Sequence, residues 1–99
     1  MIEHVVMWKF KRGNGFDPKE SAMNMKEKLE SLRGQIPGLI SIEVGINMVE
    51  SASAYDAVLV SQFESWQALE DYKVHPLHVP ISNYCKAVRE SRTRVDFEK

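Results

Sequence analysis

The segment 2–11 has the pattern of a β-strand with apolar side chains on both faces, and this constrains the fold more than any other feature. Its even positions form one almost wholly apolar face, made of Ile2, His4, Val6, Trp8 and Phe10. Its odd positions are apolar in the middle of the segment, at Val5 and Met7. Because successive side chains of a strand point to opposite faces, this strand needs cover on both. A chain of 99 residues holds one ordinary core, so we expect one domain, residues 1–99.

The rest of the chain alternates between helix and strand patterns. Asp17 is the predicted N-cap of a first helix with Pro18 at its first position, and Gly34 ends it. Ser65 is the predicted N-cap of a short helix that Pro76 breaks. A second helical stretch is predicted over 77–90, and strands are predicted over 39–47, 55–63 and 93–98. This order predicts an α+β, ferredoxin-like split βαβ fold, with the helices on one face of a four-stranded antiparallel sheet.

Apolar residues recur within these segments at helical or strand spacing, which predicts their buried faces. The predicted stripes are Ala22, Met25, Leu29 and Leu32; Trp66, Leu69 and Tyr72; and His78, Ile81, Cys85 and Val88. In strand 39–47 the predicted apolar face is Ile40, Ile42, Val44 and Ile46.

Helices on one face leave the other sheet face bare. That face is apolar at Val5 and Met7, and at Val58 and Val60 or their neighbours. A bare apolar face of this size predicts a partner. Two such sheets packed face to face form a closed dimeric α/β barrel, so we expect a homodimer through the open sheet face.

Charge and composition exclude several classes of protein. The 13 Lys and Arg residues against 14 Asp and Glu give a net charge of −1, which argues against a nucleic-acid partner. No stretch approaches the ~18 apolar residues of a membrane span, so no membrane is expected as a partner. The first residues lack the pattern of a signal peptide, and the single Cys85 excludes an internal disulfide. We therefore expect a cytoplasmic protein, with Cys85 as a small core residue.

Three polar side chains fall where the pattern predicts apolar neighbours. They are His4 on the first strand, Tyr72 on the short helix and His78 on the next helical stretch. If these stripes all face the space between helices and sheet, the three groups converge. A neutral imidazole can act as a base and a phenol can polarise a carbonyl. Asp96 on the last strand is the candidate to orient a histidine.

Each of these residues also has a purely structural interpretation. A histidine on an apolar face is commonly a satisfied core residue, and a helix tyrosine commonly packs. His75 is expected to be a helix C-terminal residue that meets the helix dipole. Asp96 can pair with Arg92 or Arg94 as well as with a histidine. His75 and His78 lie three residues apart but have a proline between them and no third ligand, so no metal site is expected.

From Ile2 to Phe97 the chain resembles the stress-responsive dimeric A/B barrel (Dabb) family. The matching pieces are the strand from Ile2 to Lys11, Ile36-Pro37-Gly38, Glu43-Val44-Gly45, Tyr55-Asp56, Phe63-Glu64-Ser65, the Tyr72 to His78 stretch and Val95-Asp96-Phe97. The resemblance implies a ferredoxin-like homodimer whose sheets form a barrel. Most members have no established activity, and some plant members are linked to stress or antifungal defence.

One plant relative in the family, olivetolic acid cyclase, closes a linear polyketide by aldol condensation and needs no cofactor. The resemblance implies catalytic roles for Tyr72 and His78, with His4 and Asp96 matching two further residues of that cyclase. The sequence differs from that cyclase at Trp8, which could fill much of the cavity. It also differs at Arg94, which could neutralise Asp96 or attract an acidic ligand. The predicted ligand pocket is lined by Val6, Trp8, Leu29, Leu59, Ile81 and Arg94.

Two functions from different classes follow. The first is a pocket for a small apolar or aromatic molecule, with cyclase-like acid/base chemistry and no cofactor. In this hypothesis His78 moves the proton, Tyr72 polarises a carbonyl and Asp96 orients His78. The alternative is a non-enzymatic stress-response interaction protein whose polar groups satisfy one another in a filled core. The cofactor-free monooxygenases of antibiotic biosynthesis are a third, weaker match.

Overall fold

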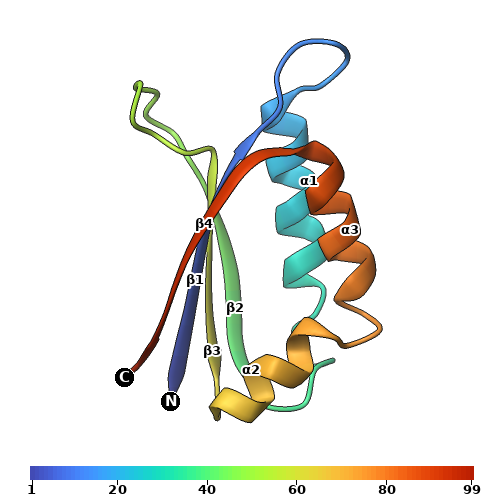
Figure 1. Ribbon diagram of the computed structural model, residues 1–99, viewed down its shortest axis with the longest axis vertical. Coiled ribbons are helices and arrows are strands. Elements are labelled where there is room, and N and C mark those ends of the chain that lie inside the picture. Colours follow the sequence, from blue (N-terminus) through green and yellow to red (C-terminus); the bar gives the residue numbers. More distant parts are fainter.

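A computed structural model describes residues 1–99, which form a four-stranded antiparallel sheet covered on one face by three helices (Figure 1). The elements in chain order are β1 (Ile2–Phe10), α1 (Pro18–Glu30), β2 (Leu39–Ile46), β3 (Ala57–Phe63), α2 (Trp66–Lys73), α3 (Val79–Val88) and β4 (Arg89–Glu98). The strands lie in the order β2-β3-β1-β4. Helices α1 and α3 run along the sheet, while α2 lies at the end where β3 finishes (Figure 1). The predicted ferredoxin-like α+β fold is confirmed.

Both predicted helix starts are correct because the caps act locally. The Asp17 side chain accepts a hydrogen bond from the backbone N–H of Lys19 at 3.0 Å, and Pro18 follows it. The Ser65 hydroxyl accepts one from the N–H of Ala68 at 3.1 Å. Each cap satisfies a backbone donor that the first helical turn leaves without a partner.

One apolar core lies between the helices and the sheet. It includes the complete first predicted stripe, from Ala22 on α1 to Leu32 just after that helix. Helices α2 and α3 contribute Leu69, Tyr72, Ile81, Cys85 and Val88. From β1 it takes the even positions Ile2, Val6, Trp8 and Phe10. The even face of β1 is therefore the one that the helices cover, and His4 is buried within it.

The last strand begins earlier than predicted, at Arg89 instead of Thr93, and α3 is correspondingly shorter than the stretch 77–90. The early part of β4 is Arg-Glu-Ser-Arg-Thr-Arg, which has no apolar side chain and therefore no apolar periodicity. Its backbone pairs with β1 all the same, from Arg89 opposite Phe10 to Arg94 opposite Val6.

Three further details differ from the sequence predictions. Ile40 is half-exposed, because the pairing of β2 with β3 shifts register between Leu39 and Ser41. Trp66 is half-exposed at the first position of α2. His75 does not end a helix, because α2 stops at Lys73; instead, its Nδ1 accepts the backbone N–H of Leu77 in the turn before α3.

The opposite face of the sheet is apolar and uncovered in the single chain, as predicted. Val5 pairs with Val60 of β3 on one side and with Val95 of β4 on the other, so the three side chains share this face. Val60 is 43% exposed and Val95 is 62% exposed. Met7 and Phe97 extend the same surface.

Candidate functional site

A cavity of about 290 Å³ lies between the sheet and the helices. Its apolar walls come from Val6, Trp8, Met25, Leu29, Leu59 and Ile81. All six predicted pocket residues line it, and so do His4, Tyr72 and His78. Asp96 does not line the cavity, since it lies behind His4.

A second hollow of about 490 Å³ lies elsewhere, by the start of α1 and the loop after β2. It is lined mainly by polar and charged residues, among them Arg12, Asp17 and Asp56. These groups already have partners: Arg12 pairs with Asp56 at 2.9 Å, and Asp17 caps α1. The chemistry that the sequence predicts is therefore concentrated in the smaller cavity.

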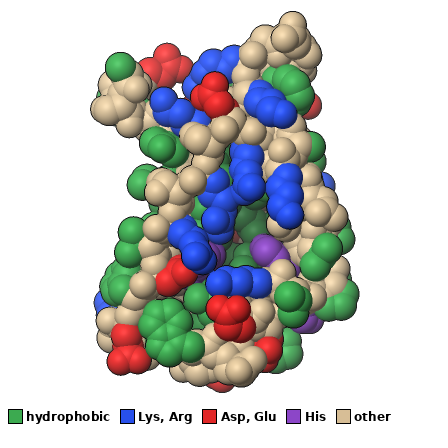
Figure 2. All heavy atoms as spheres, viewed as in Figure 1, with side chains coloured by type: hydrophobic (Ala, Val, Ile, Leu, Met, Phe, Trp, Pro, Cys, Tyr) green, Lys and Arg blue, Asp and Glu red, His purple; other side chains and the backbone are tan.

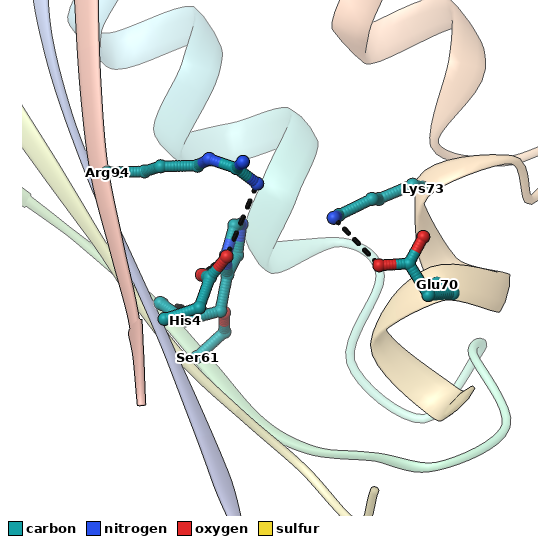
Figure 3. A network of polar contacts seen from close by, with 6 residues as sticks. His4, Ser61, Glu70, Lys73 and Arg94 are labelled. Carbon is teal, nitrogen blue, oxygen red and sulfur yellow. Dashed lines mark hydrogen bonds and ion pairs between the residues drawn. The ribbon is translucent and has the colours of Figure 1, made fainter. Parts of the chain in front are cut away.

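His4 is held in the cavity wall by a carboxylate on the neighbouring strand. Strand register places Asp96 of β4 directly opposite His4 of β1. The Nδ1–H of His4 donates to Asp96 Oδ1, and the other carboxylate oxygen accepts from Arg94 Nη1 at 3.3 Å (Figure 3). The predicted contact of Asp96 with His78 is wrong; Asp96 orients His4 instead.

The pKa of His4 is lowered because burial penalises its charged form more than Asp96 favours it. The ring is therefore neutral near neutral pH. With Nδ1–H committed to Asp96, the remaining nitrogen, Nε2, carries the free lone pair. It makes no hydrogen bond within the protein.

The rings of Tyr72 and His78 lie against each other in the lining of the cavity. Their ring centroids are 4.1 Å apart with the planes tilted by 38°. His78 Nδ1 lies 3.3 Å from the carbonyl oxygen of Lys73 and donates its proton to it, which leaves Nε2 as an acceptor. Burial lowers the pKa of His78, so this imidazole is also neutral. Burial raises the pKa of Tyr72 well above its ordinary value, so its phenol keeps its proton and can donate.

Two buried donors in the cavity wall have no partner, namely the Tyr72 hydroxyl and the Trp8 indole Nε1–H. Tyr72 is 1% exposed and Trp8 is 3% exposed. A buried polar group without a hydrogen bond costs about 1–3 kcal/mol, and such groups are rare in native proteins. Both residues belong to the lining of the cavity, which is where a bound molecule with acceptor atoms would meet them.

Trp8 lines the cavity without filling it. Its indole stacks on Phe10 with centroids 6.2 Å apart and planes 24° from parallel, which holds it along the wall. The remaining 290 Å³ is about twice the ~150 Å³ of an engineered cavity that holds benzene. The cavity therefore has room for one aromatic ring with a substituent.

The mouth of the cavity is basic, which the net charge does not reveal. Five cationic side chains line it, Lys73, Lys86, Arg89, Arg92 and Arg94, and no acidic residue does. In Figure 2 the Lys and Arg side chains gather along a hollow in which apolar side chains and a histidine are visible. Of the five, only Arg94 was predicted. The signal for Arg92 is its spacing of two residues from Arg94 and four from Asp96, which places all three side chains on one face once β4 begins at Arg89.

Comparison with known proteins agrees with this architecture. The sequence profile of the stress responsive A/B barrel domain, Dabb, matches residues 2–99. The chain belongs to this family. It is 33% identical over 78 residues to an uncharacterized protein of Streptomyces coelicolor, covering 79% of each chain. The sequence resemblance to the Dabb family is thus confirmed.

Several solved structures share this fold. A dimeric protein of unknown function with a ferredoxin-like fold from Bacteroides fragilis has a TM-score of 0.83 and 31% identity, covering 99% of this chain and 95% of the other. A hydroxynitrile lyase from Passiflora edulis has a TM-score of 0.79 and 12% identity, covering 97% and 90%. At that identity the lyase shows the shared fold alone.

Two classes of site are absent from the chain. No three His, Cys, Asp or Glu side chains lie together as a metal ion would require. None of the helices is both long and apolar enough to cross a bilayer. The polar groups that line the cavity are the imidazoles of His4 and His78, the Tyr72 phenol, the Trp8 indole N–H, the Ser82 hydroxyl, the Cys85 thiol and the cations at its mouth.

Proposed function

We propose that this Dabb protein is a cytoplasmic homodimeric barrel that binds a small apolar or aromatic molecule in the cavity and moves a proton beside its carbonyl group. The observation that carries the proposal is the Tyr72 hydroxyl, a buried donor without a partner that lies against a neutral histidine. A carbonyl oxygen supplies the acceptor that this hydroxyl lacks.

The roles follow from the protonation states. His78 Nε2 takes a proton from the carbon next to the carbonyl. The electrons of the broken C–H bond form a C=C bond to the carbonyl carbon, and the π electrons of the C=O bond move onto the carbonyl oxygen. The Tyr72 O–H donates to this oxygen as negative charge develops on it. His4, held by Asp96, places a second neutral imidazole on the cavity wall. General acid/base groups of this kind contribute ~10²- to 10⁴-fold each to a rate.

The homodimer is supported by the open face of the sheet. Val5, Met7, Val60, Val95 and Phe97 form an apolar surface that a monomer leaves in water. The similar protein of Bacteroides fragilis is dimeric. Packing two copies of this face together buries both apolar surfaces and closes the barrel.

Hydrogen exchange at carbon tests the proposed chemistry directly. The probe is acetophenone in D₂O, and NMR measures how fast its methyl protons exchange. We expect the protein to accelerate exchange, with His78→Ala abolishing the acceleration and Tyr72→Phe reducing it by ~10²-fold or more. Ser82→Ala is the matched control, since Ser82 also lines the cavity but has no role in the proposal. Bound acetophenone with no accelerated exchange would leave a binding protein without turnover.

Native mass spectrometry of protein purified without added ligand tests binding and assembly together. We expect a dimer carrying an additional small mass. A monomer at micromolar concentration would contradict the barrel. A dimer that neither retains a ligand nor binds acetophenone would favour the interaction-protein alternative.

A further inference from the structure

The charges around the cavity are one-sided. Five of the 13 Lys and Arg residues line it, whereas none of the 14 Asp and Glu residues does. Lys73 has a carboxylate partner outside the lining, Glu70 at 3.1 Å, and Arg94 has Asp96. The other three cations, Lys86, Arg89 and Arg92, have no ion-pair partner in the chain. The mouth therefore holds positive charge that the protein itself does not neutralise.

These cations come from both sides of the opening. Arg94 extends from β4 and Lys73 from α2 into the same space (Figure 3). Partial desolvation beside the cavity and, after it, the neighbouring charges of Arg89 and Arg94 lower the pKa of the otherwise exposed Arg92. Like charges held together around a hollow raise the local concentration of anions and favour their binding.

The cavity is also layered from its mouth to its floor. Cations stand at the mouth, apolar side chains form the walls, and Tyr72 lies 1% exposed at the base with its hydroxyl unpartnered. Together these layers fit a molecule that is anionic at one end and apolar in its body, with an acceptor atom at the other end. The volume of about 290 Å³ limits the body to about one substituted ring.

We propose that the cavity selects an anionic ligand, a compact apolar or aromatic carbonyl compound whose oxyanion group is held at the mouth by Arg92, Arg89 and Lys86. This proposal rests on the proposed function and specifies its substrate class. Guanidinium groups hold carboxylates and phosphates through paired hydrogen bonds, so the shared chemistry is an oxyanion on a small apolar body. The ligand then enters with its carbonyl toward Tyr72 and its charge toward solvent.

The test compares two probes of the same shape and different charge. They are 4-acetylbenzoate and the neutral 4-acetylbenzamide, with dissociation constants measured by isothermal titration calorimetry at low salt. We expect the carboxylate to bind at least tenfold more tightly, and the preference to shrink as salt is added. Arg92→Gln removes one charge-assisted contact and weakens 4-acetylbenzoate by about 10-fold or more, with no effect on the amide.

The control variant is Lys19→Gln, which removes the same charge from an exposed residue of α1 that does not line this cavity. It is expected to leave both constants unchanged. Because Arg92 is itself exposed, Arg92→Gln is expected to keep the melting temperature of the wild type. A third probe, 4-acetylphenyl phosphate, separates the two sources of oxyanion: tighter binding than the carboxylate identifies a phosphate ester, and weaker binding identifies a carboxylic acid.

Each outcome has a distinct meaning. Equal binding of the acid and the amide overturns the charge selection while leaving the proposed carbonyl pocket intact. Equal weakening by Arg92→Gln and Lys19→Gln overturns the assignment of the anion to the mouth. Failure of all three probes to bind overturns both this inference and the proposed function.

Discussion

Replacing Tyr72 by Phe should make the ligand-free protein more stable and should lower the proposed activity on a carbonyl compound. The hydroxyl is buried without a hydrogen-bond partner, a state that costs about 1–3 kcal/mol. Phe keeps the ring that packs against His78 at 4.1 Å and against Phe63 at 5.0 Å between centroids. The variant therefore loses an unsatisfied group and little packing. We expect a gain of about 1 kcal/mol, which in a domain of this size raises the melting temperature by ~4–8 °C.

Tyr84→Phe is the matched comparison, because its hydroxyl accepts a hydrogen bond from Asn24 at 2.9 Å. Losing that bond costs about 0.5–1.5 kcal/mol, so this variant should be less stable than the wild type. Both are measured by thermal denaturation at one protein concentration, since the melting temperature of a dimer depends on concentration. With saturating 4-acetylbenzamide, the difference in melting temperature between Tyr72→Phe and the wild type should become smaller or change sign. The reason is that only the wild type has a hydroxyl that the ligand can satisfy.

The opposite sign would refute this reasoning. If Tyr72→Phe lowers the melting temperature of the ligand-free protein as much as Tyr84→Phe does, the Tyr72 hydroxyl already has a partner. Its place in the cavity would then be structural, and the argument for a carbonyl acceptor would lose its main support.

Three further predictions address the dimer, the histidines and the strand pair. Val60→Asp puts a charge at the centre of the open sheet face, and sedimentation should find it monomeric where the wild type is dimeric. Burial holds the pKa of His78 below its ordinary value, so as the pH falls the unfolded chain takes up a proton at this residue before the folded protein does. The free energy of unfolding should therefore decrease below about pH 6.5, by up to ~1.4 kcal/mol per pH unit. Urea titrations should show a smaller decrease with pH in His78→Gln, and the same decrease in both proteins would contradict the prediction. His4→Ala and Asp96→Asn should not be additive in stability, with a coupling energy of about 0.5–3 kcal/mol in a double-mutant cycle, whereas additive effects would mean that the two side chains do not interact.

The parts of the structure that sequence predicts well are those with local causes. The start of α1 follows from Asp17 and Pro18, and the buried face of β1 follows from the alternation between Ile2 and Phe10. The meeting of His4, Tyr72 and His78 also follows, since each interrupts an apolar stripe and all the stripes face one core. A polar residue in such a stripe is visible from the chain alone.

The partner of Asp96 could not be predicted in the same way, because it depends on strand register. Asp96 is bound to His4 because β4 pairs with β1 at that residue; a shift by one position would send its carboxylate to the opposite face. Residue spacing within β4 carries no information about register against a strand more than 80 residues away in the chain, as the separation of 92 residues between the two side chains illustrates. The assignment of Asp96 to His78 failed for this reason.

The basic mouth was hidden for a related reason. A net charge of −1 correctly argues against binding a long polyanion, which needs many cations over an extended face. It says nothing about a small anion, for which the charge of one cavity mouth matters and the acidic residues elsewhere are screened over about 10 Å by salt. Arg92 and Arg94 lie opposite Trp8 and Val6 on the cavity face because β4 runs antiparallel to β1 from Arg89 onward. The same polar residues that obscure the start of β4 in the sequence therefore provide the charges at the cavity mouth. The charge of the preferred ligand follows from the register of β4 and not from the composition of the chain.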